Sequence, residues 1–361
     1  MTDTNDLHLL GWDASTAAAF DEAVADAPFA LVPGRVGRVD RGRVTVHAAE
    51  GALPALVRLP AGSLLEEQPT TGDWVGLERR DDGDVVRVVL PRRSAIVRRA
   101  PGGRSDGQVM AANVEHVLVA VPFETKVNLS AIERYLVVAW ESGAQPLVVL
   151  TKADLGYDPE AVRAEVEAAA PGVDVLVVSA ETGEGIDELA AVLAGGSTAL
   201  VGQSGAGKST LVNVVAGLPL QAVADTRQDG KGRHTTTARE LVPLPEGGVL
   251  VDTPGLRSIG LHDDGEGLSR TFPDVEELVE LCRFTDCAHD TEPGCAVQAA
   301  LADGTLEARR WASWQKLQRE AEWIATRHDP VARAAARKRW AAAGKAVKAQ
   351  ARIKRGELPF T

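Results

Sequence analysis

The spacing of apolar positions divides the chain into three regions. In residues 30–98, short apolar runs alternate with polar positions and are separated by turn residues, which is typical of strands. Arg41-Gly42 and Asp82-Gly83 lie between such runs and predict hairpin turns. About five or six short strands favour a small closed barrel, and an OB-type β-barrel is the natural candidate. Residues 1–29 form an N-terminal extension in which one short helix is expected.

Strands and helices alternate in the second region, residues 108–262. The pattern predicts strands at 114–121, 146–150, 173–178 and 198–201, with helices at 129–142, 159–170 and 185–193. Such alternation is typical of a parallel, doubly wound α/β sheet, whose ligands bind at the carboxyl ends of the strands. Residues 99–107 are rich in Pro, Gly, Arg and Ser, so we interpret them as a linker.

Helical spacing dominates the third region, residues 263–361. Two helices are expected, at 298–328 and 330–355, because Asp329-Pro330 interrupts the pattern and Pro favours a helix start. Trp311 and Trp314 belong to an apolar face of the first helix. The second is rich in Ala, Lys and Arg with little apolar face, so we expect order only against a partner.

A glycine-rich loop follows the apolar run 199–201. The motif Gly202-x4-Gly207-Lys208-Ser209 stands between a strand and a helix, the context that a phosphate-binding P-loop requires. Its backbone N–H groups can surround phosphate oxygens. Lys208 is expected at the β- and γ-phosphates, and Ser209 on Mg²⁺. The candidate nucleotide-binding residues of this loop are Gly202, Gln203, Ser204, Gly205, Ala206, Gly207, Lys208, Ser209 and Thr210.

Two earlier strands end in residues suited to guanine. One ends in Thr151-Lys152-Ala153-Asp154, the other in Ser179-Ala180. The Asp154 carboxylate can accept hydrogen bonds from guanine N1–H and the 2-amino group, a pair of donors that adenine lacks. The backbone N–H of Ala180 can donate to guanine O6. Either motif alone is a weak signal, but both lie at strand ends in the domain that carries the P-loop.

The segment after the P-loop helix carries candidate switch residues. His234 and Thr236 lie in a polar loop, where the Thr236 hydroxyl can complete the Mg²⁺ shell. An apolar strand then ends in Asp252-Thr253-Pro254-Gly255. Asp252 is expected to hold Mg²⁺ through water, and the Gly255 N–H to contact the γ-phosphate.

The order of these motifs is unusual. An ordinary GTPase runs from the P-loop through the switches to the guanine motifs, whereas here the guanine motifs come first. This order predicts a circularly permuted GTPase domain. The second switch then lies at the carboxyl edge of that domain, next to the third region.

All three cysteines of the chain lie close together in the third region. With one histidine they form the set Cys282, Cys287, His289 and Cys295, spaced Cys-x4-Cys-x-His-x5-Cys. Three thiolates and an imidazole complete a tetrahedral shell, which predicts one structural Zn²⁺ and no catalytic one. Their odd number disfavours a disulfide framework.

Composition and charge narrow the function class. No apolar run approaches the ~20 residues of a membrane span, and the acidic N-terminus does not resemble a signal peptide. We therefore expect a cytoplasmic protein without membrane contact. The net charge of −12 hides an asymmetry, because residues 305–361 hold fourteen Lys/Arg against five Asp/Glu. This basic tail either faces a polyanion or is a solvated helix surface. Five arginines of the predicted barrel either line a nucleic-acid face or are ordinary exposed strand residues: Arg35, Arg38, Arg41, Arg43 and Arg58.

Together, the permuted motif order, the β-rich first region and the Cys/His cluster resemble the small-ribosomal-subunit-dependent GTPase family, RsgA, also called YjeQ. The resemblance covers about residues 30–355, including an entry strand that begins at Gln108. It implies an OB-fold barrel, a permuted GTPase domain and a zinc-bound helical domain. It also implies GTP hydrolysis stimulated by the small ribosomal subunit in late maturation, with rRNA and GTP or GDP as partners. A monomer is the default expectation.

The resemblance also assigns catalysis. Where many GTPases place Gln after the glycine of Asp-x-x-Gly, this chain has Leu256, so His234 is the candidate for positioning the attacking water, alongside Lys208. One departure is Thr151, where Asn is usual in the guanine motif. A hydroxyl replaces an amide there, which predicts looser binding with guanine preference kept by Asp154.

Three other functions remain open. The GTPase domain could be a slow nucleotide switch on an RNA-binding module, which subunit-stimulated turnover would distinguish. A P-loop ATPase or kinase is disfavoured by Asp154 and Ala180. A permuted GTPase of the large subunit is disfavoured by the barrel and the Cys/His cluster.

Overall fold

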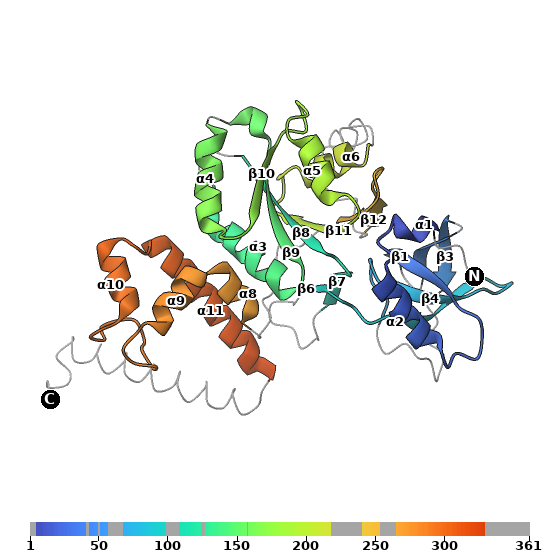
Figure 1. Ribbon diagram of the computed structural model, residues 1–361, viewed down its shortest axis with the longest axis horizontal. Helices are drawn as coiled ribbons and strands as arrows, with labels where there is room; N and C mark the ends of the chain where they lie inside the picture. The colour runs from blue at the N-terminus through green and yellow to red at the C-terminus, as the bar shows by residue number, and fades with distance from the viewer. Residues whose placement is uncertain are drawn as a thin grey trace, which may run out of the picture.

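The computed structural model describes residues 5–40, 43–49, 51–56, 68–98, 108–123, 127–156, 158–217, 240–252 and 265–328. Figure 1 shows three parts in a row: an N-terminal group of strands, a central sheet flanked by helices, and a C-terminal group of helices. Several sequence predictions lie outside the described residues. These are the Arg41-Gly42 turn, Arg58, the linker 99–107, His234, Thr236, Gly255 and the basic residues from 329 onward.

The N-terminal strands close into a ring. They are β1 (Val32–Asp40), β2 (Arg43–Ala48), β3 (Gly51–Leu56), β4 (Trp74–Glu78) and β5 (Asp84–Val89). β1 pairs antiparallel with both β2 and β4, β3 pairs parallel with β5, and β4 and β5 pair antiparallel. Alternate residues, among them Val44, Val46 and Leu77, point inward and form a buried core. The closed barrel expected from the sequence is therefore present.

The N-terminal extension packs on this barrel. It contains α1 (Asn5–His8) and α2 (Ala14–Val24), and the Asp13 carboxylate caps α2 by accepting from the backbone N–H of Thr16. Leu10, Trp12 and Phe20 are buried in one cluster with Trp74 of β4. The extension thus shares a second buried cluster with the barrel, separate from the barrel's interior core.

The central sheet has the order β10-β9-β8-β11-β13-β12. Its strands are β8 (His116–Pro122), β9 (Gln145–Thr151), β10 (Asp174–Val178), β11 (Ser197–Gly202), β12 (Glu240–Pro243) and β13 (Val249–Asp252). All neighbouring pairs are parallel except β12 with β13, which is antiparallel. A β1–β12 pairing at Arg38 and Glu240 continues this sheet into the barrel. The predicted α/β alternation is confirmed.

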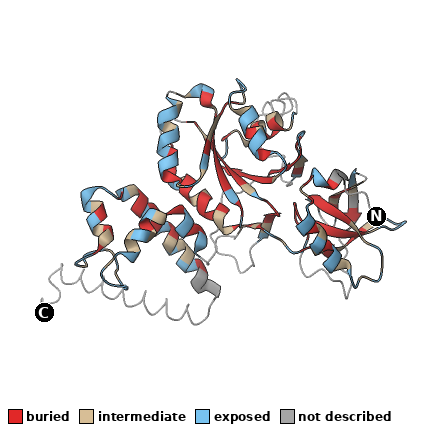
Figure 2. Cartoon of the chain, viewed as in Figure 1, coloured by how far each residue is buried: buried red, intermediate tan, exposed pale blue. Residues whose placement is uncertain are grey.

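Helices cover both faces of this sheet, and strand alternation explains how. Along β8, Val117 and Val119 belong to the core under α3 (Leu129–Glu141) and α4 (Pro159–Ala169). Leu118 and Ala120 belong to the core under α5 (Ile186–Leu193) and α6 (Lys208–Val215). Figure 2 shows buried residues along the strands and exposed residues on the outer helix faces. A small sheet of β6 (Ala95–Arg98) and β7 (Gln108–Ala112) joins the barrel to this domain.

The C-terminal part contains four described helices. They are α8 (Glu266–Thr271), α9 (Pro273–Glu280), α10 (Ala296–Asp303) and α11 (Ala308–His328). The expectation of one helix over 298–328 is wrong, because the chain turns at Gly304, whose φ is +81°. Leu306 is then buried, and its N–H donates to the carbonyl of Ala300. No helix in the described ranges is long and apolar enough to cross a membrane.

Buried arginines fix the junctions between the three parts. Arg35 is only 1% exposed, and its guanidinium donates to the carbonyl oxygens of Leu10, Gly72 and Asn113. Burial lowers its pKa to about 10. Arg35 is therefore a structural link between the extension, the barrel and the central domain, and the possibility that it lines a nucleic-acid face is wrong.

Arg310 of α11 links the C-terminal helices to the central domain. Its guanidinium bonds both carboxylate oxygens of Asp274 at 2.7 Å and lies 3.1 Å from Glu133 of α3. Glu133 is fully buried and also pairs with Arg309 at 2.9 Å. Because α3 belongs to the central domain, the C-terminal helices and the central sheet share one core.

Candidate active site and metal centre

The P-loop connects β11 to α6 through residues that need glycine. Gly202, Gly205 and Gly207 have φ values of +137°, +84° and +80°, which side-chain-bearing residues rarely adopt. A Cβ at Gly202 would lie 2.3 Å from the carbonyl oxygen of Ala120 on β8. The loop is therefore held in a curled form, the backbone conformation from which P-loop N–H groups can bind an anion.

Lys208, the first residue of α6, folds over this loop. Its Nζ donates to the carbonyl oxygens of Gly202 at 2.8 Å and Gln203 at 2.7 Å. The ammonium group thus lies at the mouth of the loop. Ser209 and Thr210 follow in the first turn of α6.

The carboxyl end of β9 contacts the P-loop directly. The Thr151 Oγ1 lies 2.7 Å from the carbonyl oxygen of Ala206 and 3.4 Å from that of Val121. Thr151 is buried. The hydroxyl therefore makes a link between the guanine motif and the P-loop, although Thr lacks the amide that Asn would supply.

Asp154 and Ser179 come together from neighbouring strands. The Ser179 Oγ donates to the Asp154 Oδ1 across 2.6 Å, and it accepts the backbone N–H of Thr182 at 3.2 Å. Lys152 adopts a left-handed conformation with φ +64°, which turns the chain from β9 into the short helix that carries Asp154. The structure thus brings the two predicted guanine motifs into one place, with Ala180 next to Ser179.

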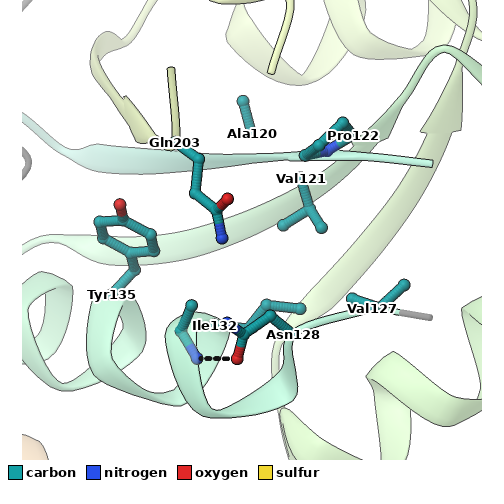
Figure 3. A pocket seen from close by; sticks show the side chains of 9 residues that line it. Ala120, Val121, Pro122, Val127, Asn128, Ile132, Tyr135 and Gln203 are labelled. Atoms are coloured by element: carbon teal, nitrogen blue, oxygen red, sulfur yellow. Dashed lines mark hydrogen bonds between the residues drawn. The ribbon is translucent and has the colours of Figure 1, made fainter. Parts of the chain in front are cut away.

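A cavity of about 160 Å³ adjoins the P-loop on the α3 side. Gln203, Pro122, Asn128, Ile132 and Tyr135 line it, and Figure 3 shows the Gln203 amide directed toward α3. The sequence did not single out these α3 residues. Asn128 caps α3 by accepting from the Ala131 N–H. An Asn directly before a helical pattern is a helix-start signal, so the sequence could have marked this end of α3.

The remaining nucleotide residues are placed only in part. β13 ends at Asp252, which is in register with Leu200 of the P-loop strand. Asp252 therefore ends a strand beside the P-loop, as the sequence predicted. His234, Thr236 and Gly255 lie outside the described residues.

The cysteines and the histidine form one cluster. Potential ligand atoms of Cys282, Cys287, His289 and Cys295 all lie within 4.8 Å of one another. The His289 Nδ1 is 3.4 Å from the Cys282 Sγ and 3.6 Å from the Cys295 Sγ, and those two sulfurs are 3.9 Å apart. Zn–S bonds of about 2.3 Å and a Zn–N bond of about 2.0 Å in a tetrahedron give edges of about 3.5 and 3.8 Å. The donor set has the size and shape of a tetrahedral zinc site.

Neighbouring groups hold this cluster in place. Cys295 is the N-cap of α10, and its Sγ accepts the N–H of Gln298 at 3.4 Å. The Gln298 side chain donates to the His289 carbonyl at 2.7 Å. The His289 ring packs edge-on against Trp311 of α11. These contacts orient the Cys295 and His289 side chains within the cluster.

Comparison with known proteins agrees with this geometry. The family model described as RsgA GTPase matches residues 89–262. A protein of Streptomyces coelicolor named small ribosomal subunit biogenesis GTPase RsgA is 52% identical over 354 residues, covering 96% of this chain and 95% of the relative. The chain belongs to the RsgA GTPase family. RsgA of Opitutus terrae is 44% identical, covering 92% of this chain and 95% of that one.

Solved structures of the family have the same fold. The crystal structure of YjeQ from Thermotoga maritima matches with a TM-score of 0.60 and 28% identity, covering 81% of this chain and 99% of that one. YloQ, described as a circularly permuted GTPase, matches with a TM-score of 0.57 over 82% of this chain and 97% of that one. At 21% identity the YloQ match supports the fold alone.

Proposed function

We propose that this GTPase binds the small ribosomal subunit and hydrolyses GTP to GDP and phosphate during late subunit maturation, with turnover stimulated by the subunit. One observation carries the proposal. The P-loop and both guanine motifs meet at one sheet edge in a chain 52% identical, over nearly its full length, to a small ribosomal subunit biogenesis GTPase.

The proposed nucleotide site uses the residues of that edge. Backbone N–H groups of Gly202–Thr210 surround the phosphates, and the Lys208 ammonium exchanges its two loop carbonyls for phosphate oxygens. Asp154 accepts from guanine, with Lys152 and Ala180 on either side. Bound Mg²⁺ supplies charge neutralisation at the phosphates. Ser209 and Thr236 would hold it, with Asp252 acting through water.

The switch residues complete the proposed reaction. The Gly255 N–H contacts the γ-phosphate, and His234 positions the attacking water. Both assignments rest on sequence position. His234 lies between α6 and β12, and Gly255 follows the end of β13. Lys208 is the second proposed catalytic residue, because it touches the reacting phosphate.

The Cys/His cluster is proposed to hold one structural Zn²⁺. Cys282, Cys287, His289 and Cys295 fit a tetrahedral shell in distance and donor type. With four protein ligands no position is left for a substrate. The metal's contribution is then to fold the loop between α9 and α10.

The barrel is proposed to be an OB fold that contacts rRNA. Its ring order β1-β2-β3-β5-β4, with β3 and β5 parallel, supports this assignment. The proposed domains are the extension 1–29, the barrel 30–98, the linker 99–107, the GTPase domain 108–262 and the zinc domain with its basic tail, 263–361. We infer a cytoplasmic monomer.

Cosedimentation tests the partner. The protein is mixed with purified small or large ribosomal subunits in the presence of GDP or a non-hydrolysable GTP analogue. We expect cosedimentation with the small subunit that is stronger with the GTP analogue. Binding to the large subunit alone, or equal binding to both, would contradict the proposal.

A further inference from the structure

A groove opens beside the Cys/His cluster, between α9, α11 and the loop that joins α9 to α10. Its volume is about 390 Å³, and its lining includes Val279 and Glu276 of α9, Phe284 of the loop, and Trp314 and Gln318 of α11. Phe284 is 41% exposed, and the Arg283 guanidinium lies 5.4 Å from the centre of its ring. The groove combines an apolar wall with a polar rim.

Exposed carboxylates lie on the helix and the loop that form this groove, next to its lining residues. Residues 265–304 contain nine Asp/Glu and two Lys/Arg. Of the nine, Asp274 and Glu266 pair with arginines, whereas Glu277, Glu280 and Asp286 are exposed and make no ion pair with any described residue. An rRNA backbone would be repelled by this surface, and a cationic segment would be attracted.

The same chain carries such a segment. Residues 329–361 contain nine Lys/Arg and two Asp/Glu, and Arg337-Lys338-Arg339 precedes a tryptophan, Trp340. We propose that residues 329–361 bind the acidic groove of their own chain, with Trp340 against Phe284 and the cations beside the unpaired carboxylates. This inference is independent of the proposed function, because it uses only the charges and the groove.

The length of chain permits this docking. From Gln318, which lines the groove, α11 continues for ten residues to His328, which is about 15 Å of helix. The nine residues from 329 to 337 can span up to about 30 Å when extended. The cationic stretch can therefore return to the groove. Covalent tethering also gives the tail an effective concentration in the millimolar range, so weak contacts suffice.

Carboxylate-to-amine coupling in the full-length protein tests the proposal. A zero-length carbodiimide reagent joins Lys338, Lys345 or Lys348 to a groove carboxylate only when the two are in contact, and mass spectrometry identifies the pair. We expect crosslinks to Glu277, Glu280 or Asp286 whose yield stays constant over about a 100-fold dilution. Their yield should fall several-fold in 0.5 M salt, because exposed charges are screened.

Two variants make the test specific. Glu280→Gln with Glu277→Gln removes two exposed charges of α9 beside the groove, and we expect the remaining Asp286 crosslinks to fall about fivefold. The matched control, Glu160→Gln with Glu165→Gln on the exposed face of α4, should leave the crosslinks unchanged. Thermal unfolding of both variants checks that they fold.

Mixing chains labelled with different nitrogen isotopes distinguishes docking of a chain's own tail from docking of a second copy. In an equal mixture of ¹⁴N and ¹⁵N chains, intrachain docking gives crosslinks within one isotope only. Mixed-isotope crosslinks would show that the groove binds a second copy and would overturn the proposal. Absence of groove crosslinks, or equal loss in the α4 control, would overturn it as well.

Discussion

The Thr151 hydroxyl donates to the carbonyl oxygen of Ala206 across 2.7 Å, joining the guanine motif to the P-loop. The alternative acceptor, the Val121 carbonyl, is 3.4 Å away. A hydroxyl has one proton to donate, whereas the amide of Asn has two. Thr151 therefore keeps the link to the P-loop that Asn would make but lacks the second hydrogen-bond donor.

Removal of this hydroxyl should weaken nucleotide binding. Thr151→Val keeps the side-chain shape but leaves the Ala206 carbonyl without its donor. A hydrogen bond of this kind contributes about 1 kcal/mol, so we expect the Kd values for GTP and GDP to rise together by about fivefold. Thr151→Ser is the control and should bind as the parent does. Unchanged affinity in Thr151→Val would show that the contact is incidental. Titration with a fluorescent nucleotide measures all three.

Base specificity should depend on Asp154. Asp154→Asn replaces an acceptor for guanine N1–H and the 2-amino group by an amide, so the guanine Kd should rise by about 100-fold or more. Xanthine carries a carbonyl at the 2 position, which the new amide can pair, so xanthosine triphosphate should bind better than GTP. Asp187→Asn, an exposed substitution on α5, is the control. Retained GTP preference in Asp154→Asn would contradict the assignment.

The Cys/His cluster should carry a metal. Elemental analysis of the purified protein is expected to give one zinc per chain, and Cys287→Ser should lower that content strongly. Nucleotide affinity in Cys287→Ser should stay within about twofold of the parent, because α6 packs in a different core from the cluster. A protein that purifies without zinc, or a Cys287→Ser variant that keeps it, would refute the structural metal.

The buried ion-pair network between α3 and α11 should stabilise the whole chain. Arg310→Leu leaves Asp274 without its bidentate partner and Glu133 buried beside Arg309 alone. Breaking such a network costs about 3–5 kcal/mol in the free energy of unfolding. Arg163→Leu breaks an exposed pair with Glu167 and should cost about 0.5 kcal/mol or less. Chemical denaturation measures the free energy of unfolding of both variants. Equal losses in the two would contradict a stabilising role of the network.

The sequence predicted the elements whose signals are local. The strand, glycine loop and helix around Lys208 follow from residue order alone, and so do the guanine motifs, because parallel strands end at one edge of a sheet. The Cys/His cluster was equally predictable, since its four residues span a short loop. These parts of the site needed no information on long-range packing.

Long-range packing decided what the sequence could not predict. Arg35 and Arg38 lie on the same strand, yet Arg35 is buried against the Trp74 ring whereas Arg38 is partly exposed and pairs with Asp40. Glu133 lies within an ordinary helical pattern, and its burial beside Arg309 and Arg310 of α11 depends on long-range packing. The break at Gly304 was also missed, because an isolated glycine inside a helical pattern is tolerated and does not by itself predict a helix end.

Hydrolysis of GTP by this protein should depend on the small ribosomal subunit. Phosphate release is measured with purified protein, with and without small subunits, using GTP and then ATP. We predict slow turnover of GTP alone, strong stimulation by the small subunit, no turnover of ATP, and loss of stimulated turnover in Lys208→Ala. Guanine-specific binding without any stimulation, or turnover of ATP at a comparable rate, would contradict it.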